Sequence, residues 1–139
     1  MLPINLTAVL VAAIANFVIG FLLHGPVGGK LWMKLAKIHP TGKEKCSDMI
    51  PQMLKNLLAN LIFAYVLAAF YLFASTSPYM TGSGALSGMI CGFWVWLGFI
   101  VTGSSMEVIW MGRSVKLWLY ELFCSLLSIL AMGAIIATW

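Results

Sequence analysis

The sequence predicts an all-α integral membrane protein: a single domain over residues 1–139 with four transmembrane helices and a short cytoplasmic interfacial helix after the first. Hydrophobic residues make up 62% of the chain and charged residues 9%, whereas about a quarter of the residues in soluble domains are charged. The eight basic and four acidic side chains all lie in two windows, 30–55 and 107–121. The uncharged stretches are long enough for apolar segments of about 20 residues, the length that crosses a bilayer.

Each expected helix is bounded by turn-forming residues or by charge. The first apolar run ends at His24–Pro26 and the second at Ser75–Pro78, and helices rarely continue through such clusters. The third run ends near Gly103, before the second charged window, and the fourth continues to the last residue. We therefore expect transmembrane helices over about 2–23, 50–74, 84–103 and 115–139.

The basic residues predict how the helices are oriented. Lysines are concentrated in the loop after the first helix, and Arg113 and Lys116 lie between the third and fourth helices. The loop after the second helix has no charge, and cytoplasmic loops are the ones enriched in Lys and Arg. We therefore expect both termini on the non-cytoplasmic side of a plasma membrane or bacterial inner membrane.

Residues 30–38 have the pattern of an amphipathic helix, with lysines on one face and apolar side chains on the other. Such a helix lies on the membrane surface, where each lysine adds about 1 kcal/mol of attraction to anionic lipid. We expect a membrane anchor here, and the alternative is a specific headgroup or partner site. The candidate headgroup contacts are Lys30, Trp32, Lys34 and Lys37.

The 84–103 helix has one face made of small residues. Its glycines include two overlapping GxxxG motifs, which let two helix backbones approach closely within lipid. We expect a partner helix to pack along this face, and the sequence leaves open whether that helix belongs to the same chain or to another copy. The candidate packing residues are Gly84, Gly88, Gly92 and Gly98.

Polar side chains on the other three helices predict a pocket. An unsatisfied amide in hydrocarbon costs several kcal/mol, so these groups must face protein or water. At a rise of 1.5 Å per residue, Asn16, Asn60 and Glu121 each lie about 10–15 Å from the cytoplasmic helix ends, and the outer half has few polar groups. We therefore expect a cytoplasm-facing pocket more than a pore. The candidate lining residues are Asn16, Asn56, Asn60, Glu121 and Ser125.

Glu121 is an ionisable residue well inside the fourth helix, and such residues have a functional role by default. A structural role is the alternative. Glu121 would then form an ion pair with Lys55 or Lys116, or be a neutral carboxyl group bonded to Asn16 or Asn60. The sequence leaves both interpretations open.

The sequence lacks the motifs of common enzymes. HExxH and GxSxG are absent, the two histidines stand far apart, and the three cysteines form no CxxC. We therefore expect no catalytic residues, no metal ion and no cofactor. The basic residues lie beside membrane segments, which favours lipid over nucleic acid as their partner.

Several stretches of the chain resemble domain-of-unknown-function family 1761. The residues that carry this resemblance are Val11–Phe21, Gly25–Pro26, Gly29–Lys30 and Trp32–Met33 for the first helix and turn, and Gly92–Phe99, Arg113 and Lys116–Leu119 for the third and fourth helices. His24 stands where we expect an aromatic residue before the Gly-Pro turn. The resemblance covers nearly the whole chain and implies a small four-helix membrane protein, but it implies no activity.

These features favour one function and leave two alternatives. The favoured hypothesis is a homo-oligomeric membrane protein that binds or moves a small solute or ion through the cytoplasm-facing pocket. The first alternative is a non-catalytic accessory or assembly subunit that docks onto a larger membrane complex through its 84–103 helix. The second is a small membrane enzyme acting on a lipid-like substrate, although the arginine and glutamate pattern of such enzymes is missing from the second helix.

Overall fold

The computed structural model describes residues 3–38, 46–80 and 82–139, so the predicted cytoplasmic lysines Lys43 and Lys45 lie outside the described residues. Within these ranges all regular structure is helical. The long helices are α1 (Leu6–His24), α3 (Cys46–Ser75), α4 (Ala85–Val95) continued by η1 (Trp96–Val101) and α5 (Thr102–Met111), and α6 (Val115–Thr138).

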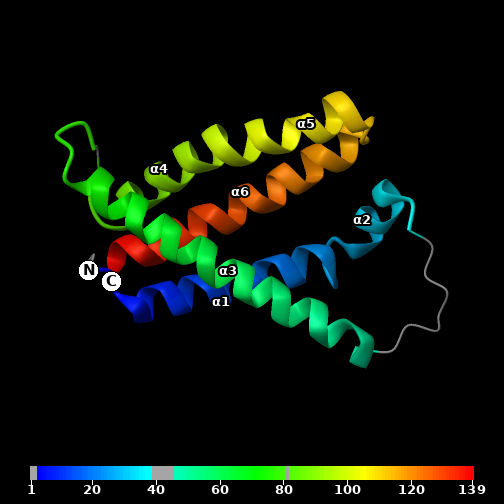
Figure 1. Cartoon of the computed structure of the whole chain (residues 1–139), viewed down its shortest axis with the longest axis horizontal. Helices are drawn as coiled ribbons and strands as arrows, with labels where there is room; N and C mark the ends of the chain where they lie inside the picture. Colours follow the sequence, from blue (N-terminus) through cyan, green and yellow to red (C-terminus); the bar gives the residue numbers. More distant parts are fainter. Residues whose placement is uncertain (1–2, 39–45, 81) are drawn as a thin grey trace.

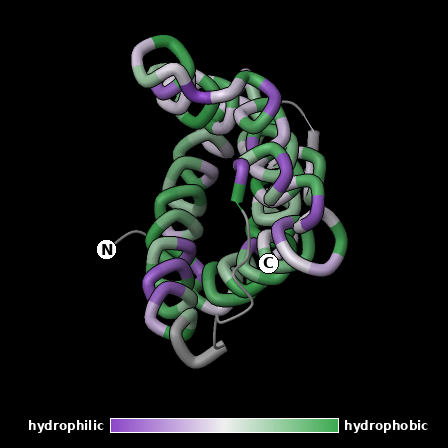
Figure 2. The backbone as a smooth tube through the Cα atoms, turned by 90° about the vertical axis from the view of Figure 1, so that its right-hand side faces the viewer, coloured by the Kyte–Doolittle hydropathy of each residue, from purple (hydrophilic) through white to green (hydrophobic). Residues whose placement is uncertain are grey.

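In the part of the chain that the structure describes, four helical segments are long and apolar enough to cross a membrane. They are Leu6–His24, Met49–Ser75, Ala85–Met111 and Val115–Thr138. Hydrophobic residues predominate along all four (Figure 2). The four segments therefore suggest an integral membrane protein.

The segments form an elongated bundle with two different ends (Figure 1). Both chain termini and the 76–84 connection lie at one end, which we call the terminal end. Helix α2 (Gly29–Ala36) and the turn between α5 and α6 lie at the other, which we call the basic end. The predicted basic loops thus share one end of the molecule.

Local sequence explains how α1 and α2 begin and end. Asn5 caps α1, because its side-chain oxygen accepts hydrogen bonds from the amides of Thr7 at 3.0 Å and Ala8 at 3.3 Å. Helix α2 ends at Ala36, and Lys37 follows in the left-handed conformation with φ of 56°. The helix expected over 30–38 is therefore shorter at its end, and Lys37 does not continue the face of Lys30 and Lys34.

The third segment extends past its expected end near Gly103 and ends at Met111. Within it, the π-helical turn η1 joins α4 to α5 without a break. A π turn is wider than an α turn, so it rotates the following side chains away from the positions that a 100° projection assigns. Gly98 lies in this turn, and a Cβ atom there would have no neighbour within 4 Å. The expected packing of Gly98 against a helix is therefore not found among the described residues.

The predicted close approach of a second helix occurs at the middle of the face of small residues on the third segment. A Cβ atom on Gly88 would lie 1.9 Å from the Gly133 carbonyl oxygen, and one on Gly92 would lie 2.9 Å from the Ile129 carbonyl oxygen. The partner helix is thus α6 of the same chain. Gly84 has no such neighbour; with φ of 56° it precedes α4 in a conformation that suits glycine.

The hydrophobic core occupies the half of the bundle toward the terminal end. Ala12 of α1, Ala64 of α3, and Ile129 and Met132 of α6 have no exposed surface, and Leu67 is 1% exposed. Small alanines at these positions allow the three helices to pack closely. This half is therefore closed, and the candidate site lies in the other half.

Candidate functional site

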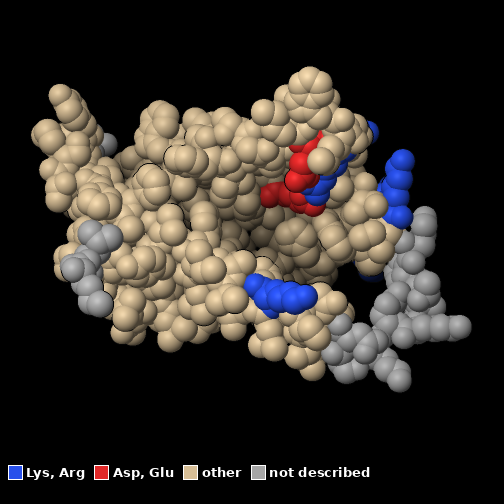
Figure 3. Space-filling model, in the orientation of Figure 1, with Lys and Arg blue, Asp and Glu red and all other residues tan. Residues whose placement is uncertain are grey.

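A cavity of about 470 Å³ lies between α1, α3 and α6 in the half of the bundle toward the basic end. Figure 3 shows the hollow on one face of the molecule, with acidic side chains at one edge and a basic side chain at the opposite edge. Lining residues come from α1 (Asn16, Phe17, Gly20, Phe21, His24), α3 (Met49, Met53, Asn56, Asn60) and α6 (Glu121, Cys124, Ser125, Ser128).

All five residues expected to line a polar pocket line this cavity: Asn16, Asn56, Asn60, Glu121 and Ser125. The Asn16 Nδ2 group donates a hydrogen bond to Asn60 Oδ1 at 3.0 Å, which connects α1 to α3. Because α1 and α3 are far apart in sequence, only their packing brings these two amides together. The cavity therefore gathers polar groups from three different helices.

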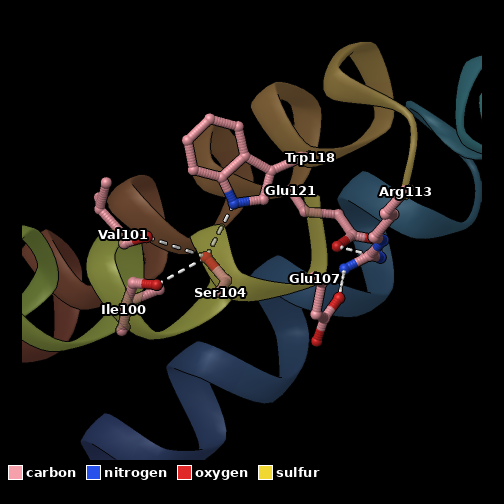
Figure 4. Close-up of polar contacts among 7 residues, drawn as sticks. All are labelled: Ile100, Val101, Ser104, Glu107, Arg113, Trp118 and Glu121. Atoms are coloured by element: carbon pink, nitrogen blue, oxygen red, sulfur yellow. Dashed lines mark hydrogen bonds and ion pairs between the residues drawn. The ribbon is translucent and has the colours of Figure 1, made fainter. Parts of the chain in front are cut away.

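Ser125 also joins helices. Its hydroxyl group donates to the Leu122 carbonyl at 2.9 Å and accepts a hydrogen bond from the Trp96 indole at 3.0 Å. A second indole bond runs in the opposite direction, from Trp118 of α6 to the Ser104 hydroxyl at 2.8 Å (Figure 4). These bonds hold η1 and α5 against α6, and they leave Ser125 less able to bind a ligand than the asparagines.

Glu121 is paired with Arg113 and not with either lysine or either asparagine that the sequence suggested (Figure 4). Both Glu121 oxygens accept hydrogen bonds from Arg113 Nη2, at 2.6 and 2.5 Å. Arg113 Nη1 also donates to Glu107. The guanidinium group is therefore shared between a carboxylate at the cavity and a carboxylate of α5.

The turn after α5 explains this arrangement. Gly112 adopts the left-handed conformation with φ of 64°, and the Arg113 amide bonds back to the Glu107 carbonyl at 3.2 Å. This reversal brings the Arg113 side chain back toward Glu107 and across to the first turns of α6. The Arg113 and Glu121 side chains are 27% and 29% exposed, so water screens their ion pair only in part.

Aromatic side chains of α1, α2 and α6 meet at the basic end, next to the lining residue His24. The Tyr120 hydroxyl group of α6 donates to the Leu23 carbonyl of α1 at 2.6 Å and passes over Gly28, where a Cβ atom would lie 2.0 Å from it. The His24 ring makes edge contacts with Trp32 at 5.7 Å and with Tyr120 at 6.0 Å between ring centroids. Trp32, a candidate headgroup contact, is thus partly buried against His24.

Toward the terminal end the cavity stops at the core. Asn16, Asn60 and Ser128 line its inner part, and the next residues along the three helices include Ala12, Ala64 and Met132, which have no exposed surface. A smaller cavity of about 160 Å³ at the terminal end shares no described lining residue with the first. Along the described residues, the two cavities therefore form no continuous path.

The family model DUF1761, described as a protein of unknown function, matches residues 7–137. The chain belongs to the DUF1761 family. The match spans α1 to α6, which confirms the resemblance found in the sequence. No curated protein and no solved structure matches the chain.

The polar lining of this DUF1761 protein follows from its sequence, but part of the site does not. Phe17, Phe21, Met49 and Met53 line the cavity although they are as apolar as lipid-facing residues, and only packing distinguishes the two. Ser128 stands on the same side of α6 as Ser125 and was detectable by that periodicity. Among the described residues, no group of three His, Cys, Asp or Glu side chains lies close enough to hold a metal ion.

Proposed function

We propose that this DUF1761 protein is an integral membrane protein that binds or moves a small polar solute or ion through the cavity, which opens toward the cytoplasm. The observation that carries the proposal is the convergence of Asn16, Asn60 and Glu121, from three helices, on one cavity of about 470 Å³. Ligand sites in proteins are commonly clefts of about 300–1,000 Å³ with apolar walls and a few polar groups.

The proposed orientation rests on the positive-inside rule, with the basic end in the cytoplasm. In that orientation the cavity opens to the cytoplasmic half of the membrane, and the alanine core lies between it and the other side. A solute would then enter and leave from one side unless α3 moved relative to α1 and α6. Binding is therefore the first step to test, before transport.

Native mass spectrometry of the protein released from its own membrane in a lipid-preserving system tests this function. We expect a bound small molecule at a reproducible mass. In the Gly20→Leu variant the new side chain would occupy the cavity, since a Cβ atom at Gly20 has no neighbour within 4 Å and Gly20 is a lining residue. We expect that variant to fold and to lose the molecule.

The matched control is Gly98→Leu. Gly98 also has open space at its Cβ position, but it is no lining residue of the cavity. We expect this control to keep the bound molecule. Retention of the same molecule by Gly20→Leu, or a wild-type protein that releases none, would contradict the proposal.

We propose that α2 lies on the cytoplasmic membrane surface and contacts anionic lipid. The support is that Lys30, Lys34 and Lys37 are exposed, whereas Trp32 packs against His24. Changing the three lysines to glutamine would weaken association with anionic lipid by about 1 kcal/mol per lysine. Lipid binding by the purified variant at low and high fraction of anionic lipid measures this, and unchanged binding would contradict it.

The expected homo-oligomer, or membership of a larger complex, is tested by the same mass spectra. The alternative function, an accessory subunit of a larger membrane complex, required the face of small residues on the third segment to be the docking surface. In the structure Gly88 and Gly92 of that face lie against α6 of the same chain. These glycines are therefore not free to dock onto another protein, and we keep the binding function as the proposal.

A further inference from the structure

The charge at the cavity edge indicates which solute would bind there. Glu121 is the only Asp, Glu, Lys or Arg among the described lining residues. Its counterion, Arg113, is shared with Glu107. When both carboxylates are ionised, this cluster of two negative charges and one positive charge has a net charge of −1, and Figure 3 shows a separate basic side chain at the opposite edge of the hollow.

The remaining lining groups are compatible with a cation. Phe17 and Phe21 stand one turn apart on α1, and aromatic faces attract ammonium groups by about 0.5–2 kcal/mol. The carbonyl oxygens of Asn56 and Asn60 are acceptors. His24 is a further titratable lining group, with its Nδ1 hydrogen-bonded to the Gly20 carbonyl at 3.0 Å. An anionic solute would instead meet the carboxylate of Glu121 with no lysine or arginine in the lining.

The size and apolar character of the cavity favour an organic ion over a bare metal ion. A volume of about 470 Å³ is far more than an ion needs, and methionine and phenylalanine side chains form much of the wall. Among the described residues no three metal-binding side chains gather. Building on the proposed function, we propose that the ligand is a small organic ammonium ion with an apolar substituent, bound with its charge toward Glu121.

This proposal gives Glu107 a defined role. Glu107 is outside the cavity lining, yet it accepts a hydrogen bond from Nη1 of the same Arg113 whose Nη2 binds Glu121. In the Glu107→Gln variant, Arg113 would pair with Glu121 alone, and the net charge of the cluster would change from −1 to zero. The cavity wall would keep every one of its lining residues, so Glu107 acts as a positioning residue for Arg113.

The experiment compares three probes of similar shape with the full-length protein in lipid nanodiscs: phenylethylammonium, the neutral 2-phenylethanol and the anionic phenylacetate. Binding is measured by calorimetry after subtraction of binding to empty nanodiscs. We expect the ammonium ion to bind the wild-type protein at least about tenfold more tightly than the alcohol, which corresponds to about 1.4 kcal/mol. Phenylacetate should bind most weakly.

Two variants test the charge directly. Glu107→Gln should lower the affinity for phenylethylammonium about five- to tenfold and leave the affinity for 2-phenylethanol unchanged. The matched control is Lys116→Gln, which changes an exposed charge near the start of α6 that does not line the cavity. The control should leave the preference between the two probes unchanged.

The outcomes separate this inference from the proposed function. Equal binding of the ammonium ion and the alcohol, or a preference that survives in Glu107→Gln, would overturn the cation assignment. So would a neutral or anionic molecule retained in the mass spectra and lost from Gly20→Leu, although the binding function would then stand. If the wild-type protein retains no molecule and binds none of the probes, the proposed function itself fails.

Discussion

The same three helices, α1, α3 and α6, pack closely in one half of the molecule and separate in the other. Toward the terminal end, Ala12, Ala64 and Met132 meet with no exposed surface. Toward the basic end, a cavity of about 470 Å³ lies between the helices, and Leu54 and Leu58 of α3 are 62% and 60% exposed. Figure 1 shows α3 diverging from α6 in this direction.

The difference follows from the size and polarity of the side chains along each helix. Alanine and glycine allow the backbones to approach, whereas the larger side chains of Phe17, Phe21 and Met53 line the cavity. The Asn16–Asn60 hydrogen bond marks the boundary between the two halves. The half toward the terminal end thus stabilises the fold, and the half toward the basic end contains the cavity. Substitutions in the two halves should therefore change stability by different amounts.

The largest difference is expected between Gly88→Ala and Gly20→Ala. A Cβ atom on Gly88 would lie 1.9 Å from the Gly133 carbonyl oxygen, so α4 and α6 would have to move apart. We expect a loss of about 3 kcal/mol or more, the upper range for overpacking. Gly20→Ala adds a methyl group where there is open space, and removing a helical glycine stabilises by up to about 1 kcal/mol.

Unfolding of both variants in the same detergent, by heat or by a denaturing detergent, gives the measurement. Equal stability of the two variants would mean that the halves do not differ in packing as the structure indicates. A Gly88→Ala protein that fails to fold at all would agree with the expectation, provided that Gly20→Ala folds.

A smaller loss is expected from Arg113→Gln, which leaves Glu107 and Glu121 without their shared cation. We expect about 2 kcal/mol, below the about 3–5 kcal/mol of fully buried pairs, because the side chains are 27–45% exposed. Adding Glu121→Gln to this variant should restore most of the loss, since it removes the uncompensated charge beside the cavity. Thermal unfolding of the single and double variants measures both effects, and no loss in the single variant would exclude a structural role for the cluster.

Tyr120→Phe tests the contact between α6 and α1 at the basic end. The change removes one hydrogen bond, from the Tyr120 hydroxyl to the Leu23 carbonyl at 2.6 Å, and keeps the ring. We expect a loss of about 1 kcal/mol. Tyr79→Phe is the control, because Tyr79 is 89% exposed, and it should not change stability. If both changes have the same effect, the Tyr120 bond does not hold α6 to α1.

The smallest effect is expected at the boundary between the halves. A double-mutant cycle with Asn16→Leu and Asn60→Leu should give a coupling energy of about 0.6 kcal/mol, the average for such bonds in a membrane protein. A cycle of Asn16 with Asn56, which is one turn closer to the basic end, should give less. Equal coupling in the two cycles would show that the Asn16–Asn60 bond is not specific.

Much of the architecture was predictable because the length and polarity of a transmembrane helix can be read directly from the sequence. Apolar runs bounded by Pro26 and Pro78 located the first two helices, and a common periodicity grouped the polar residues of each helix on one side. The third segment was the exception. Its π turn depends on backbone hydrogen bonds that no apolar pattern reveals, and the packing expected of Gly98 was not found among the described residues.

The site was predictable only as a set of polar residues. These residues line one cavity, and their role in binding a solute is a proposal. The predicted ion-pair partners of Glu121, Lys55 and Lys116, are wrong, because its partner Arg113 lies in the turn between α5 and α6. Gly112 reverses the chain there and brings Arg113 back to Glu107 and Glu121.

By itself the sequence determined four apolar helices, the basic residues that gather at one end, and the polar residues that could not face lipid. These are properties of single helices, and they depend only on length, charge and a fixed periodicity. The tertiary structure alone decided that α6 packs into the glycine face of α4, that α3 diverges to leave a cavity, and that Arg113 is shared between two carboxylates. Those features depend on the rotation of each helix about its axis and on the crossing angles between helices. Both are set by the shapes of the side chains where two helices pack together.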